Sequence, residues 1–281
     1  MRYVFFGTPT FAARVLGKLV AKDFSPVALV CNPDRPAGRK RTVTPPPTKQ
    51  LIRKEKLEDK VLILQPEDVS SIVSRLAFSK PDFFVVVAYG KILPRSVLNI
   101  PAHGAIGVHP SLLPKYRGPS PIQSAILSGE ERTGISLFRM DEEVDSGPVI
   151  ARREIPVNGK DYPELEAALG DAAGEFLAEL FPSILKGEIP YAPQNSREAT
   201  YTAKFSLEDG FVDPADLDAA AGGGKPEIAA ALERKIRALN PEPGVWTVKD
   251  GKRMKLLQSS LFGGRIRITK IQMEGKKPRT L

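Results

Sequence analysis

Short apolar segments that alternate with helical patterns are the feature that most constrains the fold of this chain. Four of these segments fall at residues 2–6, 27–31, 61–64 and 83–87. The last is an unbroken run, Phe-Phe-Val-Val-Val, as expected of a strand buried on both faces. Helical patterns separate them, through Phe11–Leu19, over about 48–56 and after Pro66. The alternation predicts an α/β fold with a Rossmann-like, mostly parallel sheet.

Local signals extend this interpretation at the ends of the predicted elements. Thr8 is predicted to cap the first helix, with Pro9 as its first residue. Residues 32–47 are rich in proline and basic side chains and are predicted to form a long loop. Three further strands are expected near residues 104–108, 134–138 and 149–155, followed by a helix over about 163–185.

The chain is predicted to have two domains. We expect a first domain over residues 1–185, a linker with turn-forming residues over 186–200, and a small β-rich domain over 201–281. In the second domain the pattern predicts a helix over 228–239 and strands near 244–248, 254–259 and 265–272. Ala219–Gly224 has the composition of a flexible insertion.

Cysteine and histidine are too scarce for most metal or disulfide chemistry. The 281 residues include one cysteine, Cys31, and two histidines. This excludes an internal disulfide and a multi-thiolate site, and predicts a protein without metal. The amino-terminal apolar run is too brief for a signal peptide or a membrane span, so we expect a soluble cytoplasmic protein that does not bind membranes.

The positive charge of the chain is concentrated near its carboxyl end. The formal net charge is +8. From Trp246 onward only two acidic residues accompany ten basic ones, which are Lys249, Lys252, Arg253, Lys255, Arg265, Arg267, Lys270, Lys276, Lys277 and Arg279. Such a patch suits an anionic partner, although basic surfaces also serve solubility.

His109 is the outstanding candidate for proton chemistry near neutral pH. It follows the predicted strand 104–108 and precedes a loop with prolines, at a strand end where sites of open α/β sheets lie. A histidine there can also serve only to bond a neighbouring carbonyl group. His103 lies in a loop and is predicted to be solvated.

Two other predicted strand ends supply partners for His109. Residues 140–148 form an acidic turn, from which either Asp141 or Asp145 could approach the imidazole and orient it. The segment Ala88–Pro94 contains a glycine turn that would let backbone approach a planar ligand closely. Gly7-Thr8-Pro9 lacks both G-x-G-x-x-G and a Walker pattern, so a dinucleotide or nucleoside triphosphate site has little support.

Five motifs in order resemble those of methionyl-tRNA formyltransferases. They are Phe6-Gly7-Thr8-Pro9, Asn32–Arg39, Val87–Gly90 with Ile92-Leu93-Pro94, Val108–Pro114 with Arg117-Gly118, and Met140-Asp141 with Asp145-Ser146-Gly147. Similarity resumes at Thr200-Tyr201, at Ile236–Thr247 and at Glu274–Pro278, so it spans nearly the whole chain.

The resemblance implies transfer of a formyl group from 10-formyltetrahydrofolate to the α-amine of methionyl initiator tRNA. Acyl transfer to an amine needs a base and stabilisation of a tetrahedral oxyanion. In the family an Asn-x-His pair and an Asp do this work, and His109 and Asp145 match the last two. The resemblance also implies contacts to the folate from Ala88, Tyr89, Gly90, Ile92, Leu93, Ser111, Leu112, Leu113, Pro114 and Asp141.

The chain departs from the family at position 107, where Gly107 stands in place of the asparagine. Losing one oxyanion donor costs about 2.7–4 kcal/mol in other enzymes. Three interpretations stay open: a backbone N–H or water compensates, the enzyme is slow, or the site is a relic that only binds.

The resemblance assigns tRNA contacts to the basic loop and tail. Arg39, Lys40 and Arg41 would contact phosphates of the acceptor stem, and Lys252 and Arg253 would hold the tRNA body. The second domain looks shorter than the family's barrel, with strands missing between Leu257 and Arg265 and little chain after Pro278. We expect a monomer that acts on tRNA. The alternatives are a formyltransferase for an amino-sugar nucleotide or another small amine, and a non-catalytic protein that binds tRNA or folate.

Overall fold

The structure, a computed structural model, describes residues 1–38, 40–188 and 190–281. The chain forms two compact units. Unit 1 comprises residues 1–117, 133–155 and 166–200, and unit 2 comprises residues 118–132, 156–165 and 201–281. Segment 190–200, interpreted from sequence as a linker, therefore packs with unit 1. The predicted limits of the domains as independently folding pieces stay a prediction.

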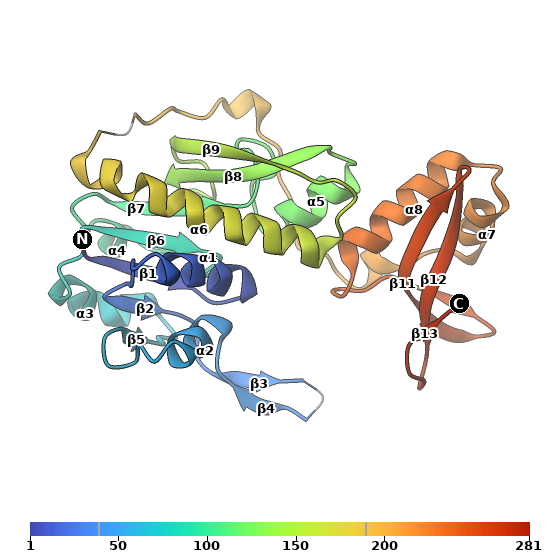
Figure 1. The fold of residues 1–281 in the computed structure, drawn as a ribbon, viewed down its shortest axis with the longest axis horizontal. Helices are drawn as coiled ribbons and strands as arrows, with labels where there is room; N and C mark the ends of the chain where they lie inside the picture. The colour runs from blue at the N-terminus through green and yellow to red at the C-terminus, as the bar shows by residue number, and fades with distance from the viewer. Residues whose placement is uncertain (39, 189) are drawn as a thin grey trace. The chain divides into compact units, whose positions relative to one another are not determined.

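Unit 1 is built on one large sheet (Figure 1). Over the described part of the chain its strand order is β5-β2-β1-β6-β7-β8-β9. The strands are β1 (Tyr3–Gly7), β2 (Ala28–Val30), β5 (Leu62–Leu64), β6 (Phe83–Val87), β7 (Ala105–His109), β8 (Arg132–Arg139) and β9 (Val149–Pro156). Neighbours from β5 through β7 run parallel, and β8 pairs antiparallel with β7. The predicted Rossmann-like, mostly parallel sheet is confirmed.

Helices cover both faces of this sheet, which explains its uninterrupted apolar strands. On one face lie α1 (Thr10–Ala21) and α6 (Tyr162–Lys186), and the Phe181 ring of α6 contacts Tyr3 and Phe83. On the other, a buried cluster joins strand residues to a 3₁₀ turn, η1 (Val69–Ile72), and to α3 (Val73–Phe78) and α4 (Arg95–Leu98). No helix among the described residues is long and apolar enough to cross a membrane.

The first helix begins differently from the prediction. Pro9 is the N-cap and α1 starts at Thr10, with no side chain capping it. The Thr8 hydroxyl instead accepts a hydrogen bond from the Asn32 backbone N–H at 3.2 Å. Thr8 therefore joins the ends of β1 and β2 rather than capping the helix.

The predicted loop 32–47 was wrong in part, because it contains a β-hairpin. Strands β3 (Arg35–Ala37) and β4 (Thr42–Thr44) pair antiparallel, and α2 (Pro47–Lys54) follows. Gly38 has φ 67° and its carbonyl accepts from the Arg41 N–H at 3.1 Å, which closes the turn. The prolines that flank these short strands favour a loop, whereas the left-handed Gly38 is what the turn of a hairpin requires.

Unit 2 combines helices with a small antiparallel sheet. The helices are α5 (Pro121–Leu127), α7 (Pro214–Gly222) and α8 (Pro226–Leu239), with a 3₁₀ turn at η3 (Glu208–Gly210). Another 3₁₀ turn, η2 (Ser196–Glu198), belongs to unit 1. The described strands lie in the order β10 (Trp246–Lys249), β11 (Lys252–Phe262), β12 (Arg265–Met273) and β13 (Arg279–Thr280). Their inner face packs on α8 through Leu256 and Ile271, both buried.

One expectation for this unit was wrong, and one predicted strand is longer in the structure. Ala219–Gly224 is not a flexible insertion, because α7 runs to Gly222 and ends at left-handed Gly223, and Ala220 is fully buried. The strand expected at 254–259 continues to Phe262, so the interval before Arg265 holds only the Gly263-Gly264 hairpin turn. Exposed polar residues at the end of β11 weakened the strand signal, but cross-strand pairing with β12 overrides local propensity.

Candidate active site

His109 is the last residue of β7, at the carboxyl-terminal ends of the parallel strands. His109 is only 6 % exposed. Its Nε2 lies 2.8 Å from the Tyr116 carbonyl oxygen and its Nδ1 lies 3.5 Å from Asp145 Oδ2. A carbonyl only accepts, so Nε2 carries the proton in that contact. The ring thus lies between two acceptors, the Tyr116 carbonyl and the Asp145 carboxylate.

The structure separates the roles of the two aspartates that the sequence left open. Asp145 reaches the imidazole, whereas exposed Asp141 holds the turn: its Oδ1 accepts from the Ser146 hydroxyl at 3.0 Å and the Glu143 N–H at 3.2 Å. Gly147 closes this turn against the Arg139 carbonyl, so closely that a Cβ there would collide with it. Asp141 therefore shapes the segment that delivers Asp145.

Three loops at the site contain residues with left-handed backbone. Ala88 has φ 45°, Tyr116 has φ 60° and Asp145 has φ 52°. Such a conformation costs a residue with a side chain of order 1 kcal/mol or more and clusters at functional sites. All three residues lie in loops that the sequence analysis had selected or adjoin them.

The predicted folate segment divides into exposed and buried residues. Ala88, Gly90 and Ile92 are exposed, and a Cβ placed on Gly90 would have no heavy atom within 4 Å. Tyr89 and Leu93 are buried in the core, where the Tyr89 ring meets Phe6 edge-on. Burial raises the pKa of Tyr89 to about 12, and its hydroxyl has no hydrogen-bond partner among the described residues.

The loop after His109 is rigidly held. Ser136 on β8 donates to the Ser111 carbonyl at 2.7 Å and accepts from the Leu113 N–H at 2.9 Å. The Ser111 hydroxyl donates to the Lys115 carbonyl, and Arg152 donates to the Leu113 carbonyl. Leu113 is 1 % exposed, while Leu112 and Pro114 are half-buried.

Gly107 faces an aromatic ring. It lies in the middle of β7, between Val86 of β6 and Phe138 of β8. A Cβ on Gly107 would collide with Cε1 and Cζ of the Phe138 ring. Phe138 is itself buried with Leu113 and Val149. The space that a side chain at position 107 would need is therefore filled.

Three residues that join the loops around His109 received no role from the sequence. Arg117 and Thr200 lie within the family motifs, and Gln194 lies in the predicted linker. Arg117 is buried at 4 % exposure and donates through Nε and a terminal nitrogen to the Gln194 side-chain oxygen. Thr200 accepts from the Tyr116 and Arg117 N–H groups, through its hydroxyl and its carbonyl respectively. Gln194 lies in a turn-rich segment with no periodic signal, so only the contacts reveal it.

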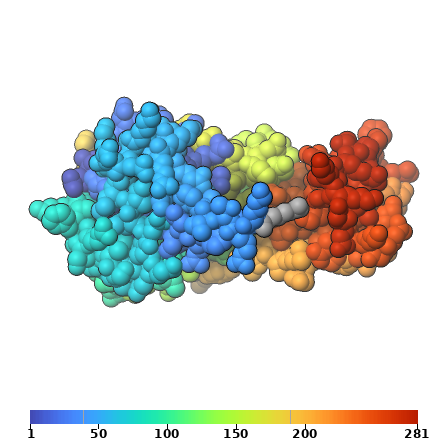
Figure 2. Space-filling model, turned by 90° about the horizontal axis from the view of Figure 1, so that it is seen from below, coloured from blue at the N-terminus to red at the C-terminus, as the bar shows by residue number. Residues whose placement is uncertain are grey.

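The described basic residues assigned to tRNA have exposed or half-buried side chains. Lys40 and Arg41 are exposed beside the turn of the β3–β4 hairpin, which is drawn in medium blue in Figure 2, and Arg39 lies outside the described residues. In unit 2 Lys252 is exposed on β11, and the Arg253 guanidinium lies 4.0 Å from the centre of the Trp246 ring.

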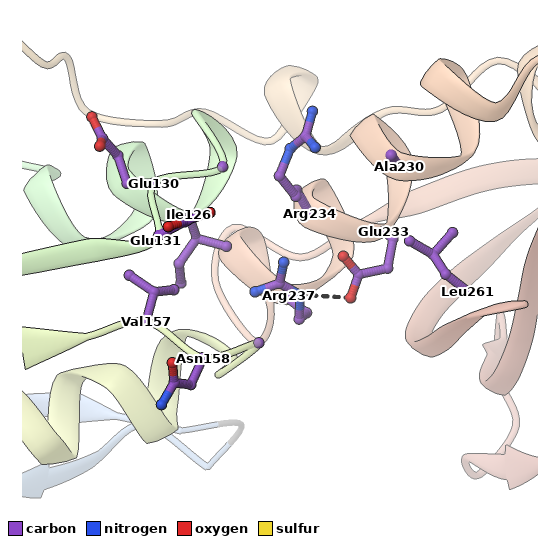
Figure 3. Close-up of a pocket in the computed structure, with 12 residues that line it drawn as sticks. Ile126, Glu130, Glu131, Val157, Asn158, Ala230, Glu233, Arg234, Arg237 and Leu261 are labelled. Atoms are coloured by element: carbon purple, nitrogen blue, oxygen red, sulfur yellow. Dashed lines mark hydrogen bonds and ion pairs between the residues drawn. The ribbon is translucent and has the colours of Figure 1, made fainter. Parts of the chain in front are cut away.

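A cavity of about 440 Å³ in unit 2 is lined by arginines that bond to neighbouring segments of the same unit (Figure 3). Arg237 lies against Glu233 at 2.6 Å and donates to the Lys160 carbonyl, and Arg234 donates to the Leu127 carbonyl. These arginines connect α8 to α5 and to the segment before α6. The lining contains none of the residues that the sequence selected.

No group of three or more metal-binding side chains occurs in the described ranges.

Two family models match the chain. A formyl transferase model matches residues 1–180, and a formyl transferase carboxyl-terminal domain model matches residues 227–263.

Curated relatives that share one name, methionyl-tRNA formyltransferase, align with most of the chain. A methionyl-tRNA formyltransferase of Halorhodospira halophila is 41% identical over 86% of this chain and 74% of its own length. A methionyl-tRNA formyltransferase of Chloroflexus aggregans is 38% identical over 93% of this chain and 81% of its own length.

Solved structures share the fold at low sequence identity. Methionyl-tRNA formyltransferase from Clostridium thermocellum has a TM-score of 0.61 and 16% identity, covering 97% of this chain and 98% of that one. An N-formyltransferase from Helicobacter canadensis, in complex with folinic acid and dTDP-3-aminofucose, has a TM-score of 0.66 and 16% identity, covering 93% and 88%. HypX from Aquifex aeolicus, in complex with tetrahydrofolic acid, has a TM-score of 0.65 and 17% identity, covering 100% and 46%. Because the formyl transferase model matches residues 1–180 and curated relatives are 38–41% identical over most of the chain, the chain belongs to the methionyl-tRNA formyltransferase family of formyl transferases.

Proposed function

We propose that this chain transfers the formyl group of 10-formyltetrahydrofolate to the α-amine of methionine esterified to initiator tRNA. The observation that carries the proposal is the pairing of buried His109 with half-buried Asp145 in a chain 41% identical to a methionyl-tRNA formyltransferase. The reaction forms a bond from the amine nitrogen to the formyl carbon and breaks the bond from that carbon to N10 of the folate. The amine loses a proton and the departing folate nitrogen gains one.

His109 is suited to hold that proton. Once protonated, the ring has an acceptor beside each nitrogen, Tyr116 O at 2.8 Å and Asp145 Oδ2 at 3.5 Å. A carboxylate that orients a histidine and stabilises its imidazolium is a recurrent arrangement in acyl transfer. We assign His109, with Asp145 as its partner, to this proton transfer. Because Nε2 already carries a proton toward Tyr116, the proton of the amine enters at Nδ1, on the side of Asp145, and returns from there to the leaving nitrogen.

Stabilisation of the oxyanion falls to groups other than a side chain at position 107. Because Phe138 fills the space beside Gly107, backbone N–H groups or water have to donate to the developing charge. A reaction without one such donor is slower by about two to three orders of magnitude in other enzymes unless another donor replaces it.

The exposed part of the Ala88–Pro94 segment fits a flat ligand such as the pterin of a folate. Gly90 leaves open space, Ile92 presents an apolar side chain that is 82% exposed, and Ala88 is exposed in a strained turn. Pterin rings bind through apolar surface and a few polar backbone groups, as planar ligands commonly do. We place the folate there and beside Asp141, with Tyr89, Leu93 and the Ser111–Pro114 loop supporting the wall.

The basic hairpin and the carboxyl-terminal sheet suit an RNA substrate. On the exposed face of β11 and β12, Lys255, Arg267 and Arg265 accompany Phe262, which is 87% exposed. Cations neutralise phosphates, and exposed aromatic rings stack on unpaired bases. This favours tRNA over a small amino sugar. We assign phosphate contacts to Arg39, Lys40, Arg41, Lys252 and Arg253.

Formyl transfer by the purified protein tests the proposal directly. We expect turnover with 10-formyltetrahydrofolate and Met-tRNA, and much less with an amino-sugar nucleotide as acceptor. His109→Ala should abolish turnover without unfolding the chain, whereas His103→Ala, the matched control at the other histidine, should retain it. Preferred use of the sugar would favour the small-amine alternative. Binding of both substrates without turnover would identify a protein that only binds them, and full activity of His109→Ala would contradict the assignment.

A further inference from the structure

The two acceptors that flank His109 come from separate loops, and one segment bonds to both of them. Residues 190–200 first join β9, where Ala192 exchanges two backbone hydrogen bonds with Val149 at 2.8 and 2.9 Å. The segment then reaches the Asp145 turn through Gln194 and the Tyr116 loop through Thr200. We call residues 190–200 the strap.

Gln194 uses the full hydrogen-bonding capacity of its side-chain amide. Its Nε2 donates to the Asp145 carbonyl at 2.9 Å and to the Gly147 carbonyl at 2.7 Å. Its Oε1 accepts from Arg117 Nε at 3.1 Å and from a terminal nitrogen of Arg117 at 2.8 Å. One amide thus links the turn that carries Asp145 to the residue that follows Tyr116.

This link matters because both loops are conformationally strained. Asp145 and Tyr116 have left-handed backbone, with φ 52° and 60°. Strained residues keep such conformations only where surrounding contacts hold them. Gln194 bonds to the carbonyl of Asp145 itself, and Thr200 bonds to the N–H of Tyr116 at 2.7 Å.

We propose that Gln194 is a positioning residue for the His109–Asp145 pair, acting through the backbone of Asp145 and through Arg117. It contacts neither substrate, and it sets the distance from the Asp145 carboxylate to His109 Nδ1 and from the Tyr116 carbonyl to Nε2. The catalytic consequence rests on the proposed formyl transfer, whereas the effect on the imidazole does not.

The chain offers closely matched variants. Gln194→Ala removes all four hydrogen bonds. Gln194→Glu keeps an acceptor for Arg117 but cannot donate to the two carbonyls, and it adds a negative charge beside Asp145. Asn195→Ala is the control, because the exposed Asn195 side chain bonds, among the residues that the structure describes, to Arg197 and Glu198 within the strap.

We expect Gln194→Ala and Gln194→Glu to lower kcat by on the order of 10²-fold, the effect of misplacing a catalytic group by about 1 Å, with little change in KM. Asn195→Ala should retain the parent kcat. At a fixed pH, the imidazole ¹⁵N shifts of His109 should move in both Gln194 variants, while those of His103, the other histidine, stay in place.

The nuclear magnetic resonance measurement keeps the inference testable if the parent protein shows no turnover, since it needs no substrate. Unmoved His109 signals in Gln194→Ala would overturn the inference, as would an equal loss of kcat in Asn195→Ala, which would indicate a general effect of the strap. A parent protein without formyl transfer, but with shifted His109 signals in Gln194→Ala, would refute the proposed function and support the positioning role.

Discussion

Restoring an asparagine at position 107 should harm this protein rather than improve it. The substitution Gly107→Asn adds a side chain whose first atom already collides with the Phe138 ring. Gly107 cannot retreat, because its strand is paired with β6 on one side and β8 on the other. Phe138 cannot retreat freely either, being 3% exposed and packed on Leu113 and Val149.

The cost can be estimated from the packing. Inserting extra atoms into a well-packed core destabilises by about 1–3 kcal/mol, and we expect Gly107→Asn to fall in the upper part of this range. Gly107→Ala, which adds the Cβ alone, should already show part of the cost. Phe138→Ala removes the obstructing ring but should cost about 3–5 kcal/mol for the cavity.

A double-mutant cycle isolates the collision. Gly107→Asn combined with Phe138→Ala should be more stable than the sum of the single changes by about 0.5–3 kcal/mol. Urea unfolding followed by circular dichroism measures the stability. Fluorescence of Trp246, the one tryptophan in the sequence, reports the unfolding of unit 2 and serves as the internal control, because both substitutions lie in unit 1.

Activity provides the second readout. We expect Gly107→Asn alone to lower turnover, because the displaced ring adjoins the strand that carries His109. A Gly107→Asn protein with the parent's stability and a turnover raised by about 10²–10³-fold, the worth of one oxyanion donor, would refute the conclusion that Phe138 fills this space.

Three further outcomes are expected. Burial raises the pKa of the Cys31 thiol to about 11, so little thiolate forms at pH 8; a disulfide reagent should label Cys31 only after unfolding, and rapid labelling of the folded protein would contradict its burial. Lys40→Glu with Arg41→Glu should raise the KM for Met-tRNA and reduce the salt dependence of tRNA binding, leaving folate affinity intact; Lys60→Glu, an exposed control of equal charge change per residue, should do neither. Arg253→Ala should shift Trp246 emission by removing the cation from its ring, and should lower the slope of log K against log salt by about 1 if Arg253 neutralises a phosphate; an unchanged slope would remove it from the RNA contacts.

Local pattern was sufficient for the parallel sheet and for the choice of His109. The central parallel strands β1, β2, β6 and β7 are buried along their whole length, so runs such as residues 83–87 stand out from the sequence. The order of strands in the sheet is not needed to see that His109 ends a strand, because strand and loop residues adjoin in the chain. The same holds for Asp141 and Asp145, whose acidic turn is a local feature.

Pattern failed where pairing across the chain decides the structure. The β3–β4 hairpin and the long β11 strand exist because a partner strand completes their hydrogen bonds. Helix α7 has few large apolar residues, and burial of Ala220 against its neighbours makes it part of the core. The two strands of the β3–β4 hairpin lie close together in the chain but are short and exposed, so they carry no apolar signal. The pairing of Met254 with Met273 and the burial of Ala220 depend on residues farther along the chain.

The sequence alone determined the fold class, the family resemblance and the candidate residues for proton transfer, because composition and short motifs carry that information. Tertiary structure alone decided that Asp145 rather than Asp141 meets His109, that Phe138 occupies the space beside Gly107, and that Gln194 links the two loops of the site. Gln194 and Asp145 are separated by 49 positions in the chain. Contacts of that kind depend on how the backbone is folded in three dimensions, which no local pattern records.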